Sequence, residues 1–537
     1  AIPKGGILNV SDEEVNAQSV RAQLNVDQKW ANHAIAAIAG AEVRSIYTNG
    51  KGYRQYGYDD DILVSLPVNY NVNYTSLVTG RQSLIPNSDS FTGLSNRYVS
   101  VYGNGSYTYK ERYVLSLSAR RDASNIFGVT TNNKWTPLWS AGLAWELSKE
   151  NFYRSATLPY LKLRATYGFS GNVDPSLTAV TTIVYSNVSP YTMSPFAQVN
   201  RFYNPDLRWE KSRQVNLGVD FSTASNRISG TVEYYEKKGI DLYGPSPLDY
   251  TAGIGRPSIT KNVASMRASG MDFMLQSANT TGMLKWTTVL NASLYRDKVT
   301  SYYLRDRNGS QFVGEGTNIS GIEGMPLYAI FSFKWAGLDP QTGDPLGIRP
   351  DGTVSKDYNQ LTGNGVSIDD LVFQGNAMPR FFGSLGNTFR WRNLSFTFYL
   401  GYKLGYYFRR PSIRYNNLFR TLDGHSDYTL RWQKPGDELH TYVPSMVYPT
   451  SAARETFYYG SEMLVGRADH IRLQYVHLAY QLSNVRGLKA LKDAQLYLNA
   501  NNLGILWAAN KEGLDPDYTT STAPVRTDIA IGLRLRL

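Results

Sequence analysis

The chain has 537 residues, no cysteine and a formal net charge of +11, and its 40 tyrosines and 46 glycines stand beside only five histidines. The absence of cysteine excludes thiolate catalysis, zinc-thiolate sites and disulfides. The positive charge does not indicate a nucleic-acid-binding protein, because lysine and arginine are scattered singly and form no basic helix or block.

Membrane-spanning helices are not expected in this sequence. No stretch approaches the roughly 18 consecutive apolar residues that such a helix needs, and the longest weakly polar run, 34–41, is short and rich in alanine. If the protein is in a membrane, it must therefore cross as a β-barrel. The first residues lack the pattern of a signal peptide, so we expect any export signal to lie elsewhere or to have been removed.

Segments of about ten residues with strict two-residue alternation recur along the chain and predict strands. In the clearest segment Phe396 and Phe398 share one face, while Ser395 and Thr397 share the other. At about 9 to 11 residues per tilted crossing, the pattern predicts an all-β fold, a transmembrane antiparallel β-barrel with about 14–16 strands. In chain order the alternating segments are 113–120, 161–168, 214–221, 228–234, 270–275, 394–402, 494–501 and 528–537.

The connections between these segments are of two kinds. Some are short polar turns, such as 109–112 and 223–226, whereas others run for tens of polar residues. Short turns on one rim and long extracellular loops on the other are typical of outer-membrane barrels, and loops of this length are often functional. In 470–482 the apolar phase changes near Tyr475, which predicts a bulge. The expected long loops are 51–95, 171–208, 238–258, 302–325, 335–379 and 409–469.

Five ordered motifs carry a resemblance to a known family. They lie at 121–128, 139–146, 161–172, 204–211 and 502–517, and 33–42 resembles a further family strand, with Ala41 at a usual tyrosine position. The chain resembles the SusC-like TonB-dependent outer-membrane transporters from about residue 19 to residue 537.

The resemblance implies TonB-energised import of a bulky nutrient, a glycan or an oligopeptide, across the outer membrane of a Gram-negative, Bacteroidetes-type bacterium. It implies a SusD-like surface lipoprotein as a partner, and a plug inside a 22-stranded barrel. The chain shows neither a plug nor a segment that engages TonB. We therefore expect residues 1–537 to be the C-terminal part of the barrel, with the plug, the TonB contact and the remaining strands on an N-terminal region absent here.

No pattern in the sequence predicts an enzyme, a metal site or a cofactor. Three consecutive carboxylates, Asp59, Asp60 and Asp61, should point in different directions and form a solvated loop, and 363–370 resembles a family loop that is richer in aspartate elsewhere. Gly-x-Ser-x-Gly elbows and glycine-rich phosphate loops before helices are missing. Histidine has no ligand spacing at any of its five positions, which are His33, His425, His440, His470 and His477.

The substrate-binding residues stay unknown at this point. Aromatic groups at 302–303, 406–408, 415 and 457–459 could stack on sugar rings or could pack inside loops, and the sequence leaves both readings open. Two other functions also stay open. A passive porin shares the alternation and needs no plug or partner, and a soluble carbohydrate-binding β protein would carry the charged face as ordinary surface.

Overall fold

The computed structural model describes the chain apart from residues 1–2, 76–79, 126–134, 173, 175–176, 178, 189–193, 249–250, 252–257, 303–307, 317–318, 364, 484–492, 519–523 and 537. Its main feature is one 16-stranded antiparallel sheet in which neighbours in sequence are mostly neighbours in space. The path runs through β1 (Gly6–Trp30), β2 (His33–Asp59), β6 (Ser90–Tyr109), β7 (Tyr113–Ser124), β8 (Trp135–Trp145), β9 (Tyr160–Asn172), β12 (Glu210–Ser222), β13 (Ile228–Pro247), β14 (Ser258–Thr281), β15 (Leu284–Tyr302), β21 (Phe381–Trp391), β22 (Leu394–Leu404), β25 (His470–Ser483), β26 (Asp493–Ala508) and β27 (Asp528–Arg536), with β3 (Val64–Leu66) paired to β2 off this path.

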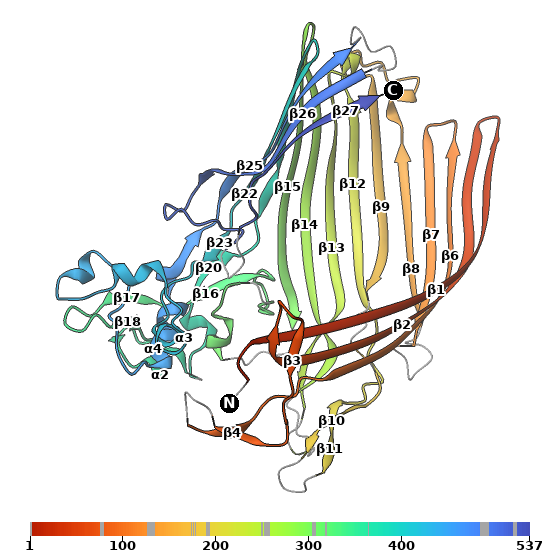
Figure 1. Cartoon of the computed structure of the whole chain (residues 1–537). Coiled ribbons are helices and arrows are strands. Elements are labelled where there is room, and N and C mark those ends of the chain that lie inside the picture. Colours follow the sequence, from red (N-terminus) through yellow and green to blue (C-terminus); the bar gives the residue numbers. More distant parts are fainter. Residues whose placement is uncertain are drawn as a thin grey trace.

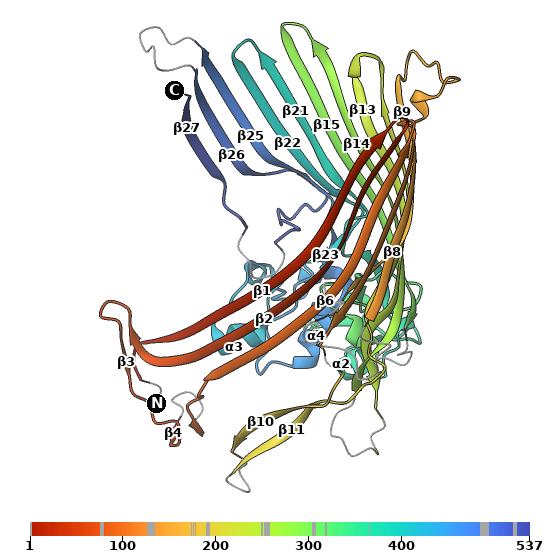
Figure 2. The same cartoon turned by 90° about the vertical axis from the view of Figure 1, so that its right-hand side faces the viewer.

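The sheet is curved and open in the described residues. Its two edges are β1 and β27, which lie apart in both views (Figure 1, Figure 2). The expectation of about 14–16 antiparallel strands is confirmed. Short turns join strands at one end, and the long connections gather at the other end, beside the hairpin of β10 (Thr182–Val188) and β11 (Pro195–Arg201).

The long connections also hold short elements. Residues 308–378 and 405–469 pack together, and we call them the loop unit. It contains β16 (Ala329–Ser332), β17 (Trp335–Leu338), β18 (Pro345–Ile348), β19 (Val354–Ser355), β20 (Val372–Asn376), β23 (Tyr407–Arg409), β24 (Val465–Arg467), α2 (Tyr358–Thr362), α3 (Tyr415–Thr421) and α4 (Ala452–Gly460). Outside it lies the small pair of β4 (Asn73–Thr75) and β5 (Gln82–Leu84). In the described part of the chain, no helix has the length and apolar character to cross a membrane.

Several strands are longer than the 9 to 11 residues assumed from the sequence. β1 has 25 residues and β2 has 27. On β1 the exposed Val20, Leu24 and Val26 form an apolar face, whereas the same face carries Asp12 and Glu14 farther along. The strand is therefore longer than its apolar band, because the backbone hydrogen bonds between β1 and β2 continue beyond the residues that need an apolar surrounding.

Two predicted loop boundaries are wrong for this reason. Residues 51–59 belong to β2 and residues 90–95 to β6, so the loop expected at 51–95 is shorter. The prediction of a loop at 238–258 is wrong for residues 238–247, because these residues continue β13 and pair with β14. Pro245 and Pro247 are tolerated there because β12 pairs with β13 only up to Ile240, so a proline lacking its N–H disrupts no central ladder.

The bulge predicted near Tyr475 is confirmed. The β22–β25 register shifts between Tyr399 and Leu400, and the β25–β26 register shifts between Leu473 and Tyr475. Gln474 is thus the extra residue, and the side chains after it change phase.

Candidate solute path and its rim

One face of the sheet is polar, and its charged side chains are paired. Arg164 on β9 donates from Nε to Asp220 Oδ2 at 2.8 Å and from Nη2 to Glu233 Oε1 at 2.6 Å. Thr231 also donates to Asp220, at 2.9 Å. Gly218 lies opposite Arg164 in the ladder, and a Cβ there would approach the guanidinium to 3.0 Å. The glycine therefore gives the arginine room to reach two neighbouring strands.

A second charged group lies on the same kind of face nearer the β1 edge. Arg21 pairs with Glu42 at 2.8 Å, and Arg120 pairs with Asp122 at 2.7 Å. Ser100 accepts from Arg120 at 2.9 Å and thus joins β6 to β7. These partly exposed pairs contribute little stability each, but they line one face with side chains of both signs.

An aromatic row crosses the polar face near the β27 edge. The rings of Tyr399 and Tyr475 are 6.1 Å apart, and Tyr475 is stacked on His477 at 6.2 Å. His477 also contacts Asn499, with Nδ1 and Oδ1 2.5 Å apart. Tyr399 lies over Gly386 of the adjacent strand, where an added Cβ would collide with the ring. Aromatic cover of a strand glycine protects its backbone and fixes the register.

The opposite face of the sheet is apolar and exposed. Leu143 is 63% exposed, Leu217 is 50% exposed and Ile531 is 73% exposed. Large apolar side chains in such numbers are not left in water by a stable protein. A shallow hollow of about 1180 Å³ on this face is lined mainly by leucine, valine and tyrosine, including Leu115 and Tyr234, so it does not fit a polar solute.

The loop unit has a core of its own. Phe457 is fully buried, and its ring centroid lies 5.8 Å from that of Phe333, 6.2 Å from that of Trp335 and 5.8 Å from that of Tyr358. This core joins the segments expected as separate loops at 335–379 and 409–469. The segments also contain the short helices α2, α3 and α4, whose five, seven and nine residues are too few to show a helical period in the sequence.

Arg409 holds the loop unit together through main-chain carbonyls. Its guanidinium, on a residue only 2% exposed, donates to the carbonyls of Gly314, Phe331, Tyr459 and Ser461 at 2.8 to 3.1 Å. Burial lowers the pKa of Arg409 to about 10, which leaves it a cation at neutral pH. Two further buried arginines are paired with carboxylates, Arg410 with Asp427 at 3.0 Å and Arg454 with Asp344 at 2.8 Å.

A polar pocket of about 360 Å³ opens between α3 and α4. Arg414 lies 3.7 Å from the centre of the Tyr459 ring, and the Asn416 amide N–H donates to Glu455 at 2.7 Å. Sequence reasoning missed this pocket, because its lining comes from 310–314, 333 and 409–460. Its full lining is Ser310, Val313, Gly314, Phe333, Arg409, Arg414, Asn416, Asn417, Ala452, Glu455, Thr456, Tyr459 and Gly460.

The motif at 204–211 fastens the long connection after β9 to the wall. Leu207 and Trp209 are buried against Ala179. Arg208 pairs with Asp241 at 2.6 Å, and Asn262 Nδ2 donates to the Arg208 carbonyl at 2.8 Å. The motif thus ties residues before β12 to β13 and β14.

The motif ending at residue 517 does the same for the β26–β27 connection. Arg472 donates to both carboxylate oxygens of Asp515 at 2.6 Å, and Lys403 donates to Asp517 at 2.8 Å. Burial alone would raise the pKa of Asp517, but hydrogen bonds from His470 and Lys403 outweigh it and hold this pKa well below its usual range. The carboxylates therefore hold this segment against β22 and β25.

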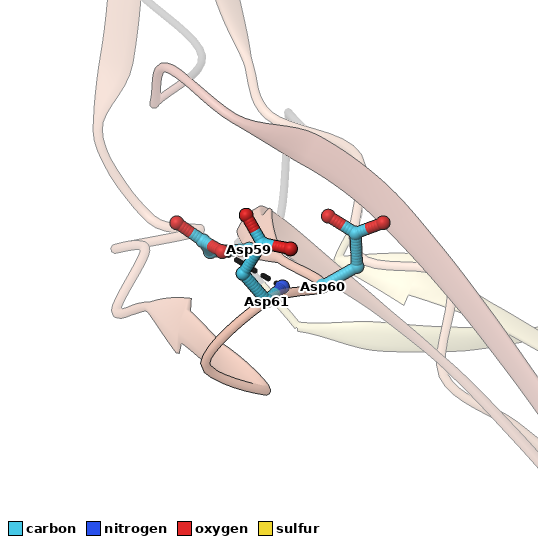
Figure 3. A group of neighbouring side chains, drawn as sticks. All are labelled: Asp59, Asp60 and Asp61. Carbon is cyan, nitrogen blue, oxygen red and sulfur yellow. Dashed lines mark hydrogen bonds between the residues drawn. The ribbon is translucent and has the colours of Figure 1, made fainter.

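The carboxylates of Asp59, Asp60 and Asp61 lie closer together than expected. One oxygen of each lies within 4.8 Å of the others, although the three side chains leave the turn in different directions, as expected (Figure 3). A tight turn causes this, since the Asp61 amide donates to Asp59 Oδ1 at 3.0 Å (Figure 3). All three residues are exposed, as the solvated-loop expectation has it.

The aromatic groups singled out from the sequence are mostly packed inside the loop unit. Tyr406, Phe408, Tyr415 and Tyr458 are buried, with only 3% to 6% of their surface exposed. Tyr459 differs, since it lines the polar pocket. Residue 303 lies outside the described residues, as does part of 121–128.

The histidines occupy separate places with local partners. His33 contacts the Tyr107 hydroxyl at 2.6 Å, His425 Nδ1 accepts the Asp427 amide at 3.1 Å, and buried His470 lies 3.5 Å from Asp517. His440 is exposed. These contacts fit structural or surface roles.

The chain matches the family of TonB-dependent receptor-like β-barrels over residues 8–503. The chain belongs to this family. The family consists of transporters and receptors rather than enzymes, and its members, SusC among them, are outer-membrane proteins. The fold is therefore that of a transmembrane antiparallel β-barrel, and the soluble alternative is wrong.

Curated relatives agree with this placement. TonB-dependent receptor P26 of Formosa agariphila is 26% identical over 510 residues, covering 92% of this chain and 48% of the relative. TonB-dependent receptor SusC of Bacteroides thetaiotaomicron is 24% identical over 445 residues, covering 79% and 41%. The chain thus spans about half the length of the curated relatives it matches.

Solved structures share the fold. The RagAB peptide importer in its "closed-closed" state superimposes with a TM-score of 0.73 at 21% identity, covering 98% of this chain and 56% of that one. At this identity the likeness concerns the fold alone.

Proposed function

We propose that this chain forms the larger part of the barrel of an active importer, which takes up a bulky nutrient, a glycan or an oligopeptide, across the outer membrane. The observation that carries the proposal is a single sheet with an ion-paired polar face and an exposed apolar face, which suits a barrel wall between lipid and an aqueous lumen. The paired charges of Arg164 and Arg120 would line the path, and residues such as Leu217 would face acyl chains.

The orientation follows from the connections. Long loops are extracellular and short turns periplasmic in outer-membrane barrels. The loop unit would therefore face the medium, where it meets the solute first. Bacteroidetes-type Gram-negative bacteria are the proposed source, in line with SusC of Bacteroides thetaiotaomicron as a relative.

The proposed energy source and partners come from the relatives. Membership of the TonB-dependent family supports a plug and a TonB contact on a further N-terminal region, whose strands would also complete the barrel. Similarity to SusC and to RagAB supports a SusD-like surface lipoprotein, and RagAB imports peptides.

Uptake measurements separate this function from a passive porin. Cells that carry the full transporter should take up labelled oligosaccharides or oligopeptides, and deletion of the TonB gene should abolish that uptake. Uptake that survives without TonB would show a passive channel instead.

The loop unit gives a second test. Removal of 309–378 together with 409–467 should abolish import while the barrel stays heat-modifiable. Both segments must go together, because either alone would leave the Phe457 core exposed. Normal import by the deleted protein would place recognition in the lumen or plug.

A further inference from the structure

The polar pocket of the loop unit is lined by several hydrogen-bond donors that are not paired with a carboxylate among the described residues. Arg414 forms no ion pair with a carboxylate among the described residues. Its guanidinium lies 3.7 Å from the Tyr459 ring centre and also hydrogen-bonds to this tyrosine. The side-chain amides of Asn416 and Asn417 make no hydrogen bond with the described residues. Three donor groups therefore line a cavity of about 360 Å³, and the side chains of Asn416 and Asn417 are not used by the described part of the fold.

The residues that line the cavity carry an excess of positive charge. Arg409 and Arg414 contribute two guanidinium groups to the lining, and Glu455 is its one carboxylate among the lining residues. One oxygen of Glu455 accepts the Asn416 amide at 2.7 Å. Arg409 is 2% exposed and, among the described residues, donates to carbonyls and to the Ser332 hydroxyl rather than to a carboxylate. Glu315 lies nearby as the acceptor of the Tyr459 hydroxyl, at 3.1 Å.

The pocket is built rigidly enough to select a ligand. Glu455 fixes the start of α3 from α4, and the Tyr459 and Ser461 carbonyls are held by Arg409. Gly460 lets the end of α4 approach Phe333 and Val313, where a Cβ would come within 2.6 Å of both side chains. Binding therefore requires little ordering of the protein.

We infer that this pocket binds a carboxylate group of the solute, with the Arg414 guanidinium as its fork-shaped donor and the amides of Asn416 and Asn417 completing the cradle. Planar guanidinium groups recognise carboxylates through two parallel hydrogen bonds. The carboxylate belongs to a hexuronate unit of an acidic glycan or to the C-terminus of a peptide. This inference rests on the proposed import function, since it names the chemical group that the loop unit captures.

Binding in detergent micelles tests the inference with the full transporter. The probes are trigalacturonate against neutral maltotriose, and a tripeptide with a free C-terminus against its C-terminal amide. The unmodified protein should bind at least one carboxylate probe and prefer it to its neutral match. Arg414→Gln should weaken that binding by about tenfold to a hundredfold, the loss expected for charge-assisted hydrogen bonds.

Matched variants keep the test clear of folding defects. Arg420→Gln removes an exposed arginine at the other end of α3, outside the pocket, and should leave binding unchanged. Asn417→Ala should weaken the binding of the carboxylate probe and leave the binding of the neutral probe unchanged. A heat-modifiability gel should show the same folded barrel for each variant.

The outcomes separate the inference from the proposed function. Equal affinity of Arg414→Gln and the parent, or no preference for either carboxylate probe, overturns the pocket inference even when cells import normally. Carboxylate binding without any TonB-dependent uptake leaves the pocket in place and overturns the import function. If Arg414→Gln releases a copurifying lipoprotein and leaves probe binding unchanged, the pocket holds an acidic side chain of the partner, and the solute inference fails.

Discussion

The barrel wall and the loop unit treat their apolar side chains in opposite ways. On the wall, Leu217 and Ile531 point outward with half or more of their surface exposed. In the loop unit, Phe457 and Leu464 are fully buried. The wall therefore depends on lipid and on a continuous backbone ladder, whereas the loop unit folds around a water-excluding core like a small soluble domain. Because the two regions are stabilised in different ways, different substitutions should unfold each of them.

The largest effect should follow from Phe457→Ala. Deleting a fully buried phenylalanine ring costs about 3 to 5 kcal/mol, and here it removes contacts with Phe333, Trp335 and Tyr358. Limited proteolysis should cleave the loop unit, while the barrel stays heat-modifiable. Leu439→Ala, at a position 78% exposed in the same unit, is the control. Loss of the barrel itself would show that the two regions are not separable.

The wall should respond to the reverse kind of change. Phe398→Arg places a charge on the apolar face near the middle of β22 and should cost about 2 to 4 kcal/mol near the bilayer midplane. Thr397→Arg, on the polar face, should cost less, because Thr397 contacts Thr388 and lies opposite His477. Urea unfolding in lipid vesicles measures both. Equal costs, or the reverse order, would contradict the assigned faces.

The contacts that hold the β26–β27 connection against the wall should contribute less stability than the core of the loop unit or the lipid-facing residues of the wall. Arg472→Gln removes two hydrogen bonds of 2.6 Å to the Asp515 carboxylate, and bonds to charged groups contribute about 1.5 to 3 kcal/mol. Hydrogen exchange should rise in residues 509–518 and stay unchanged in β12. Arg420→Gln serves as the control, and unchanged exchange near 515 would show that the pair does not hold this segment.

The smallest effect should depend on pH. The pKa of Asp517 is lowered in the fold from its ordinary value of 3.8, so its ionised form is favoured when the segment is docked. Its stabilising contribution, about 1 kcal/mol for a partly exposed pair, is complete above that ordinary value and is lost as the pH falls below it. Exchange in 509–518 should stay level down to about pH 4 and increase as the pH falls below that, when it is measured in steps of about one unit. Asp517→Asn should remove most of this pH dependence.

The sequence predicts the wall far better than the loop unit, for physical reasons. Successive side chains of a strand in the bilayer face lipid and water in turn. The polarity of Phe396 and Thr397 therefore assigns each to its face without information about neighbouring strands. Residues 238–247 escape this rule, because β13 has left its apolar band and its glycine and prolines resemble a turn. Ser451 caps α4 and is a local signal for that helix, but nine residues are too few for a clear period.

The pocket could not be predicted in the same way. Its donors Arg414 and Asn417 meet the Gly314 segment only after about a hundred intervening residues fold. Arg409 likewise appears in the sequence as one basic residue among many, and only its four carbonyl partners identify it as buried. The motifs at 204–211 and 502–517 resemble family features in the sequence, but only the ion pairs with Asp241 and Arg472 show that they attach loops to the wall.

The most direct test concerns the two faces of β12, and residues 1–537 contain no cysteine that would compete for a thiol label. Single cysteines placed from 215 to 221 in the full transporter would carry a bimane label, in vesicles that contain brominated lipid. We expect strong quenching at 215, 217, 219 and 221 and weak quenching at 216, 218 and 220, because Asn216 and Asp220 share the polar face. Uniform quenching along β12, or quenching in the opposite phase, would contradict a wall with lipid on one side and the import path on the other.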